Sequence, residues 1–173
     1  SVLLVPRDCK QHFRTQYYDY PYILRHTDYK VDEKTQDVVF ISYDEKNADL
    51  NYDILKKYYP QAKRLHGVEG QLNALRRAAE ISDTDHYFAV FAKTEVLPEF
   101  KFDFQPDRLQ APKHYIFHSR NPLNGLEYGA MNINLYNVRL VLDTKPGLDF
   151  TLSQLHTVVP EVGCISRFIT DPW

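Results

Sequence analysis

Between residues 37 and 96, short continuous apolar runs alternate with segments in which apolar residues recur at helical spacing. Residues 38–43 and 86–91 are short apolar runs bounded by polar residues, which is typical of strands that are buried on both faces. Between them, apolar residues recur at helical spacing over 47–59 and 71–81, and 62–66 is predicted to be a short strand. This alternation indicates an α/β fold, a mixed and mostly parallel sheet with helices on both sides.

The two predicted helices each have an apolar side. In the first helix, which Pro60 ends, this side consists of Leu50, Ile54, Leu55 and Tyr58. In the second helix it consists of Leu72, Leu75, Ala78 and Ala79.

The second half of the chain is predicted to be rich in strands. Residues 114–120 and 131–136 are strand candidates, and 121–125 (Asn-Pro-Leu-Asn-Gly) form a turn between them. Residues 101–104 also alternate between polar and apolar positions. From residue 145 onward we expect loops, with one short helix near 151–155.

Residues 1–36 do not follow the alternating scheme. Pro21 interrupts an aromatic cluster, so a regular helix is not expected there. We interpret 1–36 as an N-terminal extension or linker and 37–173 as the domain. The chain begins with Ser1 and ends at Trp173, and we interpret it as part of a longer protein.

Composition limits the classes of function. The chain has 173 residues and a formal net charge of −2, so charge does not indicate nucleic acid as a partner. Cys9 and Cys164 lie far apart and match no metal-binding spacing, which favours free thiols in a reducing compartment. No apolar run is long enough to span a membrane, and no signal-peptide pattern opens the chain, so neither a membrane partner nor secretion by its own signal is expected.

Ligands of parallel sheets bind beyond the carboxyl ends of the strands. The loops after residues 43, 66 and 91 are therefore where function is expected. His66 either contacts a phosphate or ribose or packs against the backbone. Gly67 and Gly70 permit tight turns before a predicted helix N-terminus, which is a natural anion site. Asn47 follows the first of these strands, and it is as well suited to capping the first helix as to contacting a ligand.

The stretch from Gly67 to Glu95 resembles the nucleotide-sugar-binding half of GT-A glycosyltransferases, the family-2-like group. Residues 67–74 correspond to the family's glycine loop and helix start, with Gly67, Gly70, Asn73 and Ala74 at the matching positions. Asp83-Thr84-Asp85 corresponds to the turn, and 87–91 to the strand that follows. The resemblance implies a fold of the nucleotide-diphospho-sugar-transferase type.

Four segments in the same order are similar to glycosyltransferase-like proteins of tailed bacteriophages. They are residues 37–48, 62–68, 120–129 and 170–173. This resemblance implies a phage protein in the host cytoplasm or the virion, with other segments of a larger phage protein or assembly as partners.

The chain departs from the family at the metal site. The family's strand ends in Asp-Gly-Asp, then a small residue and an acid, and the motif carboxylates hold Mg²⁺ or Mn²⁺ against the donor diphosphate. The corresponding residues here are Phe91, Ala92, Lys93, Thr94 and Glu95, so both carboxylates are missing and no metal cofactor is predicted. Lys93 replaces the cation as a point charge, or marks an inactive site kept for binding or assembly, or is a solvated loop lysine. Glu95 remains as a lone acid.

The resemblance also implies roles for other residues. Donor binding is expected from Ser42, Asp44, Glu45, His66, Gly67, Gly70, Asn73 and Glu95. The acceptor or phosphate side is expected at Arg120, Asn124 and Tyr128, although a salt bridge and ordinary turns explain these residues equally well. Asp44 and Glu45 could also form an ordinary strand-end turn. The catalytic candidates are Lys93 and Asp171, the latter as the base that deprotonates an acceptor hydroxyl.

Two functions remain open from the sequence. The first is a glycosyltransferase-like domain that binds a nucleotide-sugar and transfers the sugar to an acceptor hydroxyl without a metal ion. The second is a catalytically inactive copy of that fold, which serves as a binding or structural module of a larger viral protein. A fold alone does not decide between them.

Overall fold

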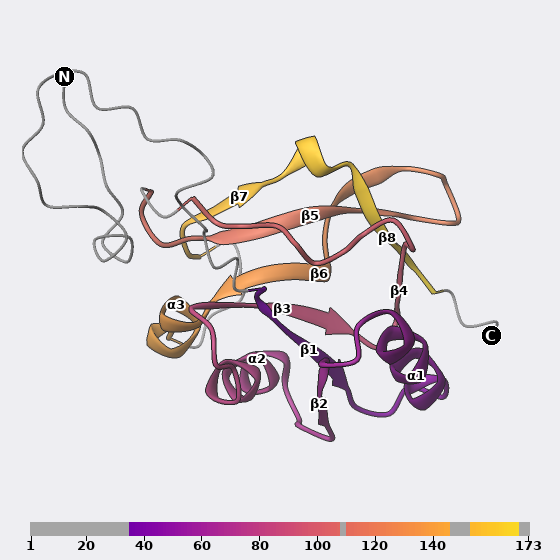
Figure 1. Cartoon of the computed structure of the whole chain (residues 1–173), viewed down its shortest axis with the longest axis horizontal. Coiled ribbons are helices and arrows are strands. Elements are labelled where there is room, and N and C mark those ends of the chain that lie inside the picture. Colours follow the sequence, from indigo (N-terminus) through magenta and orange to yellow (C-terminus); the bar gives the residue numbers. More distant parts are fainter. Residues whose placement is uncertain (1–34, 108–109, 146–152, 170–173) are drawn as a thin grey trace, which may run out of the picture. The chain divides into compact units, whose positions relative to one another are not determined.

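The computed structural model describes residues 35–107, 110–145 and 153–169 (Figure 1). The strands are β1 (Asp37–Ser42), β2 (Lys63–His66), β3 (His86–Phe91), β4 (Thr94–Val96), β5 (His114–Arg120), β6 (Glu127–Asn137), β7 (His156–Val158) and β8 (Cys164–Phe168). The helices are α1 (Ala48–Tyr58), α2 (Gln71–Glu80) and α3 (Val138–Asp143), with a short 3-10 turn η3 (Pro160–Val162). None of the helices in this part of the chain has the length and apolar character needed to cross a membrane.

The strands form one mixed sheet in the order β2-β1-β3-β6-β5-β8-β4, and β7 pairs with β5. β1 is parallel to both β2 and β3. β6 is antiparallel to β3 and to β5, so β5 runs in the same direction as β3. β7 and β8 are parallel to β5, and β4 is antiparallel to β8. The predicted α/β class, with a mixed and mostly parallel sheet and a β-rich second half, is confirmed.

Helices pack against both faces of the sheet, as predicted. Successive strand residues point to opposite faces, so β1 supplies Phe40 to one apolar layer and Ile41 to the other. Leu55 of α1 packs in the layer of Phe40, whereas Leu75 of α2 and Val141 of α3 pack in the layer of Ile41. Burial on both faces explains why β1 and β3 are continuous apolar runs in the sequence.

A polar network joins the amino ends of β1 and β3. The carboxylate of Asp37 accepts hydrogen bonds from Lys63 Nζ at 3.0 Å and from the backbone N–H of Asp83 at 2.6 Å. Burial alone would raise the pKa of Asp37, but these hydrogen bonds and the charge of Lys63 lower it overall. The network fixes the predicted turn between α2 and β3 at the sheet edge opposite the carboxyl ends of β1–β3.

The second half differs from the prediction in several elements. The alternating residues 101–104 do not form a strand, because Phe102 adopts a left-handed φ of 56° that no extended strand allows. The expectation of loops after residue 145 is also wrong, since β7 and β8 pair with β5. The helix expected at 151–155 is not found in its described part, residues 153–155. The sequence pattern does not predict β4 or α3.

Helix α1 buries fewer apolar side chains than predicted. Leu55 is buried, but Leu50, Ile54 and Tyr58 are 58%, 41% and 70% exposed. Asn47 occupies the N-cap position of α1 without a capping hydrogen bond from its side chain. In α2, by contrast, Leu75, Ala78 and Ala79 are buried as predicted.

Candidate functional site

The carboxyl ends of β1, β2 and β3 lie at one edge of the sheet (Figure 1). Ser42 at the end of β1 is in register with His66 of β2, and Ile41 with Phe91 of β3. Helix α1 connects β1 to β2 on one face, and α2 connects β2 to β3 on the other. Because the two crossovers lie on opposite faces, the crevice between the ends of β1 and β3 is the topological switch point, where ligands of such sheets bind.

Ser42 and His66 form a hydrogen-bonded pair at this edge. Ser42 is buried, and its Oγ lies 3.0 Å from Nδ1 of the exposed His66 ring. The backbone N–H of Gly67 donates to the carbonyl oxygen of Ser42 at 3.0 Å, which fixes where the loop after β2 leaves the sheet. The pair places one imidazole at the edge, with its Nε2 making no hydrogen bond to a described residue.

The loop from Gly67 to Gly70 leads into the N-terminus of α2. Both glycines have positive φ, +74° and +83°, which only glycine adopts without strain. No side chain of the described segments caps the helix, and Gln71 Nε2 instead reaches Met131 Sδ of β6 at 3.3 Å. Asn73 Nδ2 donates back to the carbonyl oxygen of Glu69 at 3.1 Å, which stabilises the loop. The helix end therefore presents N–H groups that make no bond to a described side chain, together with the positive end of the helix dipole.

The end of β3 carries the residues that correspond to the family's metal motif. Phe91 is half-buried and packs in the apolar layer of α2, and Ala92 is buried. Lys93 is exposed in the turn between β3 and β4, and its carbonyl oxygen accepts from the N–H of Ile169 at 2.9 Å. Its ammonium group has no ion-pair partner among residues 35–107, 110–145 and 153–169.

These residues do not fit the metal ion that the family resemblance implies. Mg²⁺ and Mn²⁺ prefer several oxygen ligands. Phe91 and Ala92 offer no side-chain oxygen, and Lys93 repels a cation. Within the described part of the chain, no three His, Cys, Asp or Glu side chains lie together in a metal-binding group.

Asp44 and Glu45 follow β1 in a tight turn. Glu45 Oε2 accepts from the backbone N–H of Tyr43 at 2.8 Å, and the carbonyl oxygen of Glu45 accepts from Ala48 N at 3.1 Å. Glu45 is therefore engaged in the turn, whereas the exposed Asp44 carboxylate has no bond to a described residue.

Glu95 and Arg120 are both held in ion pairs. The Glu95 carboxylate accepts two hydrogen bonds from the guanidinium of Arg167, one of them at 2.7 Å. Arg120 donates two hydrogen bonds to Glu127, one of them at 2.9 Å. Each pair joins neighbouring strands in register, which is a structural use of these charges.

The remaining candidates on the acceptor side make turn contacts. Asn124 Oδ1 accepts from the N–H of Leu126 at 3.0 Å, and the Tyr128 hydroxyl lies 3.3 Å from Asn121 Nδ2. These contacts shape the tip of the β5–β6 hairpin. Asp171 lies outside the described residues.

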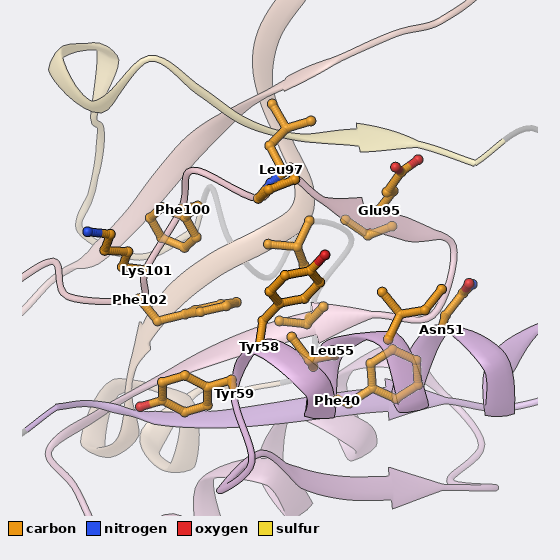
Figure 2. Close-up of a pocket in the computed structure, with 15 residues that line it drawn as sticks. Phe40, Asn51, Leu55, Tyr58, Tyr59, Glu95, Leu97, Phe100, Lys101 and Phe102 are labelled. Atoms are coloured by element: carbon orange, nitrogen blue, oxygen red, sulfur yellow. The ribbon is translucent and has the colours of Figure 1, made fainter.

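The sequence pattern does not indicate a pocket that lies beside this edge. The pocket has a volume of about 240 Å³ and lies between α1 and the segment 94–102 (Figure 2). Asn51 lines it and donates from Nδ2 to the carbonyl oxygen of Ala92 at 2.8 Å, which connects the pocket wall to the end of β3. Two signals could have indicated it: the wide apolar side of α1, and the closely spaced phenylalanines at positions 100 and 102.

The sequence matches no protein-family model and no curated protein. Among solved structures, the fold is similar to a glycosyltransferase involved in the glycosylation of the major capsid of PBCV-1, with 9% identity, a TM-score of 0.48, and coverage of 79% of this chain and 96% of the other. It is also similar to the bifunctional IspDF from Campylobacter jejuni, with 9% identity, a TM-score of 0.44, and coverage of 71% and 49%.

A third similar structure is the 4-diphosphocytidyl-2C-methyl-D-erythritol synthase from Anaerococcus prevotii, with 10% identity, a TM-score of 0.42, and coverage of 73% and 89%. Similarities at this level concern the course of the chain alone. The function has to come from the residues at the carboxyl edge.

Proposed function

We propose that this chain is a glycosyltransferase-like domain that binds a nucleotide-sugar at the carboxyl edge of β1–β3 without a divalent cation. One observation supports the proposal: the Ser42–His66 pair, the uncapped N-terminus of α2 and Lys93 all lie at or directly after the carboxyl ends of β1, β2 and β3, which share one edge of the sheet. The sequence segments that resemble GT-A and phage glycosyltransferases support the same function.

The diphosphate of the donor would be held by backbone N–H groups and one ammonium group. A helix N-terminus carries roughly half a positive charge, and Lys93 adds one full charge. Together they provide about +1.5, compared with +2 for the family's metal ion, so most of the neutralising charge is retained. In this proposal Asp44 bonds a ribose hydroxyl, and His66 bonds a ribose hydroxyl or a phosphate, as the family resemblance implies.

Sugar transfer requires a base as well as a donor site. In the proposed reaction, the acceptor hydroxyl loses its proton to a carboxylate and its oxygen attacks the anomeric carbon. The bond from that carbon to the diphosphate oxygen breaks in the same step, and the nucleoside diphosphate leaves with the bonding electrons. Glu95 is bound to Arg167, so we keep Asp171 as the proposed base.

A second function is favoured by the ion pairs of Glu95 and Arg120. If these charges serve only to join strands, the domain binds a nucleotide-sugar or a partner protein without turnover. This would suit an inactive module within a larger viral protein. Anion-exchange chromatography can detect released nucleoside diphosphate. Its release indicates transfer or hydrolysis, whereas its absence in the presence of binding indicates a module without turnover.

Nucleotide binding can be tested by thermal melting with uridine, guanosine and cytidine diphosphates and their sugars, in EDTA and in Mn²⁺. A ligand at one hundred times its Kd stabilises the folded state by about 2.7 kcal/mol, so we expect a rise in Tm in EDTA. Lys93→Ala should weaken binding about tenfold, the order of one charge-assisted hydrogen bond.

Lys57→Ala is the matched control for this experiment. It removes the same charge from the last turn of α1, away from the carboxyl edge, and should leave binding unchanged. The proposal fails if no nucleotide raises Tm, or if a rise is seen only with Mn²⁺.

A further inference from the structure

The pocket between α1 and segment 94–102 has an apolar floor. Phe40, Leu55 and Val90 line it and are almost completely buried. Its volume of about 240 Å³ exceeds the roughly 150 Å³ of an engineered apolar cavity that binds benzene. Ile54 and Tyr58, at 41% and 70% exposure, lie at the mouth, so the pocket opens to solvent. It has room for a ligand of one or two rings.

The aromatic wall of the pocket is held in place by packing rather than by the pocket's contents. Phe102 has the sole positive φ of any non-glycine residue in the described segments, at 56°. This conformation costs about 1–2 kcal/mol and persists because the buried ring packs against its neighbours. Its centroid lies 4.8 Å from that of Phe100, 5.1 Å from Phe88 and 5.3 Å from Tyr59. Figure 2 shows the rings of Phe100 and Phe102 on one side of the pocket, with Tyr58 facing them.

One wall of the pocket offers a hydrogen-bond acceptor. The amide of Asn51 is oriented by its 2.8 Å bond from Nδ2 to the carbonyl oxygen of Ala92. Its Oδ1 accepts no hydrogen bond from the described residues, so it can accept one from a ligand. The nearby Glu95 is already paired with Arg167, and an unpaired charge is costly to bury in apolar surroundings. The other charged lining residue, Lys101, is exposed, so its ammonium group is solvated and needs no buried partner. An uncharged ligand with a hydroxyl donor therefore fits the apolar floor best.

We propose that this pocket binds the apolar, ring-containing part of an uncharged alcohol or phenol, with its hydroxyl donated to Asn51 Oδ1. Ala92, to which Asn51 is bound, directly follows β3 and precedes Lys93. The hydroxyl would thus lie beside the carboxyl edge. The binding of this alcohol is independent of the proposed function. Its role as the acceptor of sugar transfer rests on the proposed function.

The probe is 2-naphthol, compared with 2-methylnaphthalene, which has the same shape but no donor. Isothermal titration of the whole chain should give saturable binding of 2-naphthol, and about five- to tenfold weaker binding of 2-methylnaphthalene, the value of one neutral hydrogen bond. No binding of 2-naphthol, or equal binding of the two compounds, would overturn the proposal.

The location is tested with two tryptophan variants of α1. Ile54→Trp should fill the mouth of the pocket and weaken 2-naphthol binding at least tenfold. Leu50→Trp adds the same group four residues earlier, at a 58% exposed position outside the pocket, and should bind normally. Melting curves check that both variants are folded. Unchanged binding by Ile54→Trp would place the ligand elsewhere and overturn the proposal.

Nucleotide titrations on the same samples separate the two proposals. If 2-naphthol binds and no nucleotide binds, the proposed ligand of the pocket is supported, and its role as the acceptor of sugar transfer is overturned. Binding of a nucleotide without 2-naphthol overturns the pocket and leaves the proposed function standing.

Discussion

Replacing Phe88 by alanine is expected to lower the free energy of unfolding by about 3–5 kcal/mol, the usual cost of deleting a large buried aromatic side chain. Phe88 is fully buried in the middle of β3. Its ring centroid lies 5.1 Å from that of Phe102, 5.7 Å from Phe100 and 5.9 Å from Phe117. The change removes buried area and leaves a cavity that these rings fill only in part. Urea unfolding measures the loss.

Phe88→Leu is the control for this prediction. It keeps an apolar side chain of smaller volume, so its cost should be about 1.5 kcal/mol. Because Phe100 and Phe102 also form the pocket wall, 2-naphthol should bind less well to Phe88→Leu than to the unchanged chain. A loss below about 1 kcal/mol for Phe88→Ala would mean that the aromatic layer is not packed as described.

Acid is expected to remove about 2–3 kcal/mol of stability between pH 7 and pH 4.5 through His114 alone. Burial, with smaller contributions from the charges of His86 and His156, lowers the pKa of His114 from 6.5 to about 4. The folded ring has to stay neutral because its Nδ1 accepts the backbone N–H of Asn137 at 3.1 Å. Below pH 6.5 the unfolded chain binds a proton at this histidine that the folded chain does not. The free energy of unfolding therefore falls as the pH falls from 6.5 towards 4, and the contribution of neutral His114 is fully present above pH 6.5.

The measurement is the urea midpoint at pH 7 and at pH 4.5. His114→Gln should be less stable than the unchanged chain at pH 7, yet lose about 2–3 kcal/mol less on acidification. His118→Gln, at the other end of β5, is the matched control and should retain the full pH dependence. Equal pH dependence in the unchanged chain and in His114→Gln would contradict the burial of a neutral His114.

The first half of the fold is predictable because each of its elements is specified locally. β1 and β3 are buried on both faces and so form continuous apolar runs, and α2 has a clear buried stripe. β4, β7 and β8 have only 3, 3 and 5 residues and are set by pairing with distant strands. The four-residue β2 is recognisable because it lies between two predicted helices, whereas these strands belong to no such alternation. The alternation over 101–104 does not lead to a strand because the positive φ of Phe102 turns the backbone away from the extended conformation.

The candidate site is predictable only in its position. Strand order and the two crossovers bring Ser42, His66 and Phe91 to one edge, as the rule for parallel sheets requires. The partners of the charged residues are not readable, since Arg167 lies 72 residues from Glu95. The pocket escapes prediction for the same reason, because its two walls are separate stretches of chain that meet only in the fold.

We propose that the carboxyl edge of β1–β3 binds a nucleoside diphosphate without a metal ion. Backbone amide chemical shifts of the labelled chain, recorded during a titration of uridine or guanosine diphosphate in EDTA, test it most directly. We expect saturable shifts at Ser42, at residues 67–71 and at Lys93, and none at the opposite edge around Asp37 and Asp83. Shifts that require Mn²⁺, or a titration that leaves Gly67, Gly70 and Lys93 unmoved, would contradict the claim.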